Sequence, residues 1–151
     1  MAAMKLLDVN VWLALVLSGH THHQAARAWL DGEEKRASLC FCRATQQGLL
    51  RLLTTAEVLA RYGNPPLTNR EAWKVLDRFM EDERITFATE PEGVEETWKA
   101  LAIRDTASPK LWMDAWLAAF ALRSGLQMVT TDRAFSQFKG LKVVRVWHRS
   151  G

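Results

Sequence analysis

Short apolar runs alternate with longer stretches of helical periodicity along this chain of 151 residues, and this alternation restricts the fold more than any other feature. The apolar runs, typical of strands, are 5–9, 37–42, 84–89, 126–131 and 142–147. The helical stretches are 11–17, 21–32, 43–61, 69–82, 93–105 and 113–125. Strands that alternate with helices usually form a parallel sheet with helices on both faces. The sequence therefore predicts an α/β fold.

The whole chain, 1–151, is predicted to be a single domain, because it contains no internal repeat, low-complexity segment or linker. Its 48% hydrophobic and 25% charged residues are ordinary for a globular protein. We expect a cytoplasmic protein, since there is neither an apolar run of membrane-spanning length nor a signal peptide. Cys40 and Cys42 lie too close together for a disulfide framework and fit buried thiols in a reducing compartment.

Two aspartates are predicted to lie at one edge of the sheet. Asp8 ends the first strand and Asp132 follows the fourth. In parallel sheets, ligands bind outside the carboxyl ends of the strands, at the point where the strand order reverses. If the first and fourth strands are neighbours, both carboxylates face one crevice.

Two further polar residues lie on apolar helix faces near this edge. Asp114 shares a helical stripe with Leu117 and Ala118, and Gln46 shares one with Leu49 and Leu50. Such stripes normally pack on the sheet.

Each acid also has a simpler interpretation. Asp8 could cap the next helix, Asp114 could favour a helix start, and Asp132 could be a turn or cap residue. Three carboxylates at one place repel each other, however, and a divalent cation is the simplest compensation. A ligand set of oxygens without Cys or His favours Mg²⁺ or Mn²⁺ over Zn²⁺.

The ordered set of motifs resembles the PIN-domain nucleases, and more closely the VapC-type toxins of bacterial toxin–antitoxin pairs. The matching pieces are LLDVNVWLAL, HHQAARAWL, CRATQQGLLRLLT, MDAWLAAFA and MVTTDRAF, which span nearly the whole chain. The resemblance implies a three-layer α/β/α sandwich with a five-stranded parallel sheet. It also implies an endoribonuclease dependent on Mg²⁺ or Mn²⁺, inhibited by a small antitoxin, in a homodimer or a toxin–antitoxin hetero-oligomer.

The family's acidic set corresponds to Asp8, Asp114 and Asp132, which the resemblance makes catalytic metal ligands. Thr130 (or Thr131) and Asn10 match polar positions that commonly accompany these acids. The family usually has a glutamate in the third helix, where this chain has Gln46. An amide can still accept a hydrogen bond from a metal-bound water. The lost charge leaves an alternative: a degenerate domain that binds RNA or a protein partner without cleavage.

Other patterns have weaker functional readings. Arg43, Arg51, Arg104, Lys110 and Arg133 lie near the acidic segments and would guide an RNA backbone, consistent with the net charge of +3. A haloacid-dehalogenase-type phosphatase is disfavoured, because it requires a second aspartate two residues after the first.

The histidines and tryptophans suggest surfaces and not a metal centre. The clustered histidines at 20, 22 and 23 fit a helix start better than a zinc site. Trp12 and Trp73 are the tryptophans that we expect to be exposed for an antitoxin or dimer interface.

Overall fold

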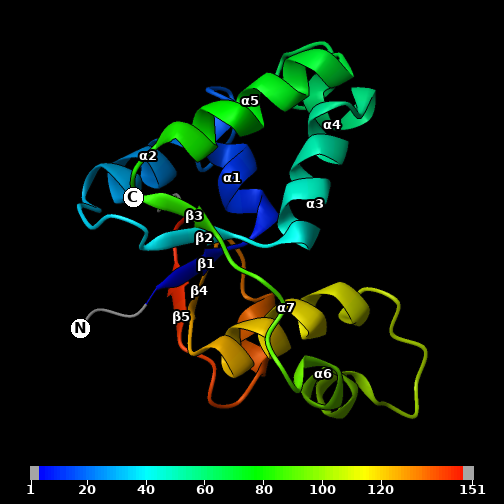
Figure 1. Ribbon diagram of the computed structural model, residues 1–151. Helices are drawn as coiled ribbons and strands as arrows, with labels where there is room; N and C mark the ends of the chain where they lie inside the picture. Colours follow the sequence, from blue (N-terminus) through cyan, green and yellow to red (C-terminus); the bar gives the residue numbers. More distant parts are fainter. Residues whose placement is uncertain (1–3, 148–151) are drawn as a thin grey trace.

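The computed structural model describes residues 4–147, which form one five-stranded parallel sheet with helices on both faces (Figure 1). The elements are β1 Lys5–Leu7, α1 Val9–Val16, α2 His23–Asp31, β2 Leu39–Phe41, α3 Arg43–Leu53, α4 Ala56–Ala60, α5 Asn69–Glu81, β3 Ile85–Phe87, α6 Val94–Ala102, α7 Leu111–Ser124, β4 Gln127–Thr130, the 3₁₀ turn η1 Ala134–Gln137 and β5 Val143–Arg145. The predicted three-layer α/β/α fold is confirmed.

The strand order is β3-β2-β1-β4-β5, with every neighbouring pair parallel. The chain first builds outward from β1 to β3 and then continues on the other side of β1 with β4. The order therefore reverses between β1 and β4, where Leu7 is in register with Val129. This is the position at which parallel α/β sheets bind ligands.

The two faces of the sheet have separate cores. Helices α1 to α5 lie on one side and α6 and α7 on the other (Figure 1). Side chains alternate along the central strand, so that Leu7 joins the first core and Leu6 the second. Helix α1 is mostly buried within the first layer, and Trp12 is 0% exposed, stacked on Phe41 with ring centroids 3.8 Å apart. The predicted exposure of Trp12 is therefore wrong, whereas Trp73 is exposed as predicted.

Two predicted helix boundaries are corrected by local hydrogen bonds. The stretch 43–61 divides into α3 and α4, because the Thr54 and Thr55 hydroxyls donate to the carbonyls of Leu50 and Arg51 at the helix end. Helix α2 begins after His22 and not after Thr21, because the His22 carbonyl accepts the first helical hydrogen bond, from the Ala26 N–H at 2.9 Å.

The predicted cap of α5 is confirmed. The Thr68 hydroxyl accepts from the Glu71 N–H at 3.1 Å, and the Glu71 carboxylate accepts from the Thr68 N–H at 3.0 Å.

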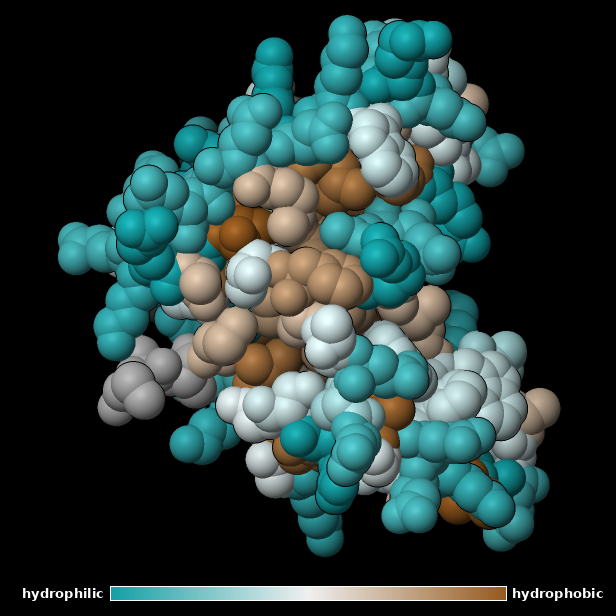
Figure 2. All heavy atoms as spheres, viewed as in Figure 1, coloured by the Kyte–Doolittle hydropathy of each residue, from teal (hydrophilic) through white to brown (hydrophobic). Residues whose placement is uncertain are grey.

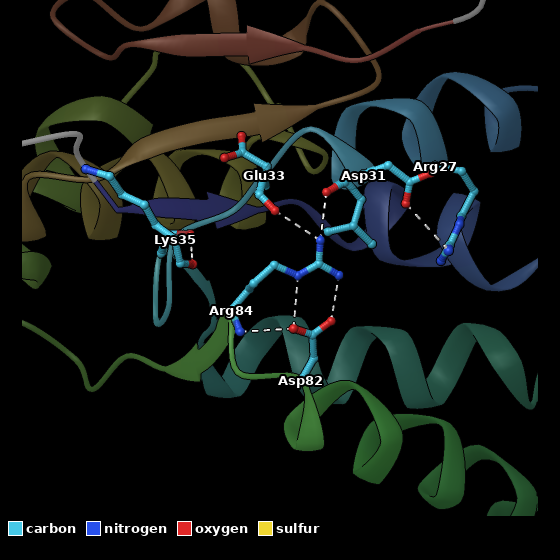
Figure 3. Close-up of polar contacts among 8 residues, drawn as sticks. Arg27, Asp31, Glu33, Lys35, Asp82 and Arg84 are labelled. Atoms are coloured by element: carbon cyan, nitrogen blue, oxygen red, sulfur yellow. Dashed lines mark hydrogen bonds and ion pairs between the residues drawn. The ribbon is translucent and has the colours of Figure 1, made fainter.

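Arg84 lies directly before β3 and connects three segments of the chain (Figure 3). Its guanidinium donates to both carboxylate oxygens of Asp82 and to the backbone carbonyls of Leu30 and Glu33. The Glu33 side chain in turn pairs with Lys5 at 2.8 Å. These contacts fix the connection after α2 against β1 and the start of β3.

Candidate active site

The pairing of β1 with β4 brings Asp8 beside Thr130. The Asp8 N–H donates to the Val129 carbonyl at 2.8 Å, and the Thr130 hydroxyl donates to Asp8 Oδ2 at 3.1 Å. The same hydroxyl accepts from the Asp132 N–H at 3.3 Å. Thr130 thus connects the two predicted carboxylates that follow neighbouring strands.

Asp114 reaches the same edge from the first turn of α7. It shares a pocket of about 160 Å³ with Asp8, between the start of α1, helix α3 and helix α7. The lining residues are Asp8, Val9, Ala44, Thr45, Gly48, Arg51, Leu52, Met113, Asp114 and Leu117. In Figure 1, α3 and α7 lie on opposite sides of the carboxyl edge of the sheet. We call this hollow the acid pocket.

The electrostatics of the three aspartates link them as one group. Burial, and then the neighbouring charges of Asp132 and Asp114, raise the pKa of the Asp8 carboxyl to about 7, although the Thr130 hydroxyl opposes the shift. Burial and the charge of Asp132 also raise the pKa of Asp114. The charges of Asp132 and Asp114 thus make ionisation of Asp8 less favourable, as expected for acids that share a site.

Asp132 has a structural role as well. Its side chain is exposed, and Oδ1 accepts from the Ala134 N–H at 2.8 Å where the 3₁₀ turn η1 begins. The simpler interpretation of Asp132 as a turn residue is thus also correct. Asn10 is exposed in the first turn of α1, outside the set of residues that line the acid pocket.

Gln46 is buried but is directed toward another residue. Its Oε1 accepts from Arg43 Nη1 at 2.7 Å, and the Arg43 guanidinium lies 4.7 Å from the centre of the Phe87 ring. The α3 positions that line the acid pocket are others, among them Thr45 and Gly48. For Gln46 to orient a metal-bound water, its amide oxygen would have to exchange its contact with Arg43.

Gly48 is a site position that the sequence interpretation missed. A Cβ atom there would lie 2.8 Å from Val9 Cγ2, so the absence of a side chain lets α3 approach the start of α1 beside Asp8. The available signal was a glycine in the middle of a helix, which is unfavourable unless close packing requires it.

The donor chemistry of this edge fits Mg²⁺ or Mn²⁺. Asp8 is 8% exposed with an unfavourable charge, and all three acids offer hard oxygen ligands. Among residues 4–147, however, no group of three or more His, Cys, Asp or Glu side chains is already arranged to hold a metal ion. The three aspartates lie at the same edge of the sheet, but they do not form a preformed metal-binding cluster.

Comparison with known proteins identifies the family of this chain. The family model described as "PIN domain" matches residues 5–141, and the chain belongs to this family. Within it, the chain is similar to Ribonuclease VapC41 of Mycobacterium tuberculosis, with 57% identity over 93% of this chain and 97% of that protein. It is also similar to Ribonuclease VapC44 of the same organism, with 31% identity over 87% of each chain.

Solved structures agree with the fold. The M. tuberculosis toxin VapC20, described as cleaving the sarcin–ricin loop, superposes with a TM-score of 0.65 and 19% identity over 93% of this chain and 98% of that one. DNA-bound VapBC from Salmonella typhimurium gives 0.64 and 14% identity, over 95% and 98%. At these sequence identities, the structural similarity supports only the assignment of the fold.

Proposed function

We propose that this chain is an endoribonuclease that requires Mg²⁺ or Mn²⁺ and acts as the toxin of a type II toxin–antitoxin pair. The observation that carries the proposal is the gathering of Asp8, Asp114 and Asp132 at the strand-order reversal, where burial and then the charges of the other two acids raise the pKa of Asp8. The 57% identity to a protein named a ribonuclease supports RNA as the substrate. A cytoplasmic location follows from this proposal.

In the proposed mechanism, Asp8, Asp114 and Asp132 would hold the cation. A divalent cation would neutralise the charge of the phosphate and make an attacking water more acidic. Thr130 keeps the Asp8 carboxylate in position through its hydroxyl and restrains the loop that carries Asp132 through the backbone N–H. The walls of α3 and α7 limit access of bulk water to Asp8, which is almost fully buried.

Cleavage of a labelled RNA panel tests the proposal. We expect cleavage with Mg²⁺ or Mn²⁺ and none in EDTA, and we expect Asp8→Asn and Asp114→Asn to lower the rate by more than about 100-fold, the scale of loss for groups that stabilise transition-state charge. Asp77→Asn, which removes an exposed carboxylate from α5, is the matched control. Full metal-dependent activity in both site variants would contradict the assignment, and a parallel DNA panel tests the choice of RNA.

A second candidate is a degenerate domain that binds RNA or a protein without cutting. The specific observation in its favour is Gln46, which stands where the family usually has a glutamate and directs its oxygen to Arg43. RNA binding without cleavage, under every metal condition, would favour this alternative.

The proposed partner is a small antitoxin that binds and inhibits the chain. The solved VapBC complexes that share this fold support such a partner. Co-expression with the product of a small neighbouring reading frame, followed by size-exclusion chromatography and the cleavage assay, tests it. An antitoxin should co-elute with the chain and suppress cleavage.

A further inference from the structure

Three hollows adjoin one another along the carboxyl edge of the sheet. The acid pocket shares Arg51 with a hollow of about 330 Å³ between α3 and α5, and it shares Asp114 with a hollow of about 500 Å³ before α7. The α3–α5 hollow is lined by Leu50, Arg51, Thr54, Asn69, Ala72 and Trp73. Figure 2 shows the outline of the molecule indented on this side, between the two helical layers. Neighbouring hollows thus have a lining residue in common, and we call this succession of three hollows the path.

The charged side chains that line this path are acidic at its centre and basic on both sides. The acids lie at its centre, Arg51 lies on the α3 side, and Arg104 and Lys110 line the hollow on the other side. Arg51 is exposed, and its guanidinium forms no ion pair with any of residues 4–147. Cations on both sides of an acidic centre suit a polyanion that crosses the centre, because each flanking phosphate meets a positive group.

The five basic residues singled out in the sequence are therefore not equivalent. Arg43 is engaged with Gln46 and Phe87, away from the acid pocket wall. Arg51 lies three residues after Gly48, and both residues line the acid pocket. The close approach of α3 to α1 at Gly48 thus also brings Arg51 to the pocket rim.

Trp73 adds an aromatic surface to the α3–α5 hollow. It is 54% exposed on α5, and the buried Ala72 and the polar Asn69 line the hollow beside it. An exposed indole next to a cation is a suitable platform for an unpaired base, since every base offers a flat face for stacking while the cation binds the backbone. A folded duplex would not present such a base.

We propose that a single strand of RNA follows this path, with Arg51 binding a phosphate next to the scissile position and Trp73 stacking on the base beyond it. The inference rests on the proposed ribonuclease function and names how that site holds its substrate. Arg104 and Lys110 bind the strand on the other side of the acids.

Binding of fluorescent single-stranded RNA, measured by anisotropy at several salt concentrations, tests the path. The measurements use the Asp8→Asn background, so that binding is observed without cleavage. We expect Trp73→Ala to raise Kd about 5- to 30-fold. We expect Arg51→Gln to raise Kd about 10-fold at low salt and to lower the slope of log Kd against log salt by about 0.7, the value of one phosphate contact on a single strand. Arg78→Gln on α5 and Trp112→Ala, an exposed indole on α7 outside the path, are the matched controls.

The outcomes distinguish a failure of the proposed RNA path from a failure of the proposed ribonuclease function. If Arg51→Gln and Trp73→Ala bind RNA like the background while cleavage by the parent chain is normal, the path is wrong and the ribonuclease stands. Loss of affinity in Trp112→Ala and not in Trp73→Ala overturns it equally, because the base would then stack on α7 and not on α5. If the parent chain neither binds nor cleaves RNA, the proposed function fails first. Circular dichroism and melting curves establish that each variant is folded.

Discussion

At the scale of single residues, Asp8 combines a stabilising position with a destabilising charge. It follows β1 and holds the backbone of β4, yet its carboxylate is buried among other acids. The folded chain therefore binds a proton at Asp8 more readily than the unfolded chain does. Stability linked to Asp8 is present at pH values below about 4 and is lost as pH rises toward the folded pKa of about 7.

Replacing Asp8 by Asn removes this pH dependence. Without metal, we expect Asp8→Asn to be more stable than the parent chain at pH 8, by on the order of 2–4 kcal/mol, and the difference to shrink toward pH 4. The amide oxygen can still accept from Thr130, so the hydrogen bond is kept. Urea unfolding in EDTA across this pH range measures the effect, with Asp77→Asn as the control. A parent chain as stable as the variant at pH 8 would show that Asp8 carries no such penalty.

At the scale of elements, the packing of α3 on α1 depends on Gly48. Alanine normally stabilises a helix interior relative to glycine by about 1 kcal/mol. Here its Cβ would lie 2.8 Å from Val9 Cγ2, so either the Val9 side chain or one of the two helices must shift. We expect Gly48→Ala to destabilise the chain by about 1–3 kcal/mol, as overpacked cores do.

A double variant gives this prediction its control. Removing the opposing methyl groups in Gly48→Ala/Val9→Ala should recover part of the stability lost in the single glycine variant, because the contact is relieved. Thermal melts of the two single variants and the double variant form the cycle. Stabilisation by Gly48→Ala alone would mean that the helices are not held at this distance.

The helices and strands also show which structural features could be predicted from the sequence. Apolar runs and caps predicted every strand and the start of α5, because these signals act over a few residues. The break between α3 and α4 was missed, since Thr54 and Thr55 are compatible with a helix until their hydroxyls bind its last carbonyls. The exposure of Trp12 was wrong because α1 is covered from several sides, which periodicity cannot reveal.

The candidate site was predictable for a different reason. Asp8 and Asp132 directly follow the first and fourth strands, so both could be placed at the carboxyl edge of the sheet. The backbone topology alone determines where this edge lies. The direction of Gln46 was not predictable. It depends on the competing donor Arg43, three residues earlier, and on the ring of Phe87 from another strand.

At the scale of the whole molecule, cation binding should appear as stability. A ligand that binds only the folded chain stabilises it by about 2.7 kcal/mol at one hundred times its Kd. We expect saturating Mg²⁺ or Mn²⁺ to raise the melting temperature of the parent chain at pH 8 and to leave that of Asp8→Asn almost unchanged. Calorimetric scans with and without the cation measure this shift. An equal shift in both chains would place the bound ion elsewhere.

No helix between residues 4 and 147 combines the length and the apolar content that a bilayer crossing requires. Residues from distant parts of the chain lie side by side in the three-layer fold. The hydrogen bond from the Thr130 hydroxyl to Asp8, for example, joins residues that are 122 positions apart.

That separation has a consequence during synthesis on the ribosome. A nascent chain that stops before β4 has Asp8 but lacks both the strand that positions it and the loop that carries Asp132. Under the proposed function, the acidic site is therefore incomplete, and cleavage of RNA absent, until β4 and the loop that follows it have left the ribosome.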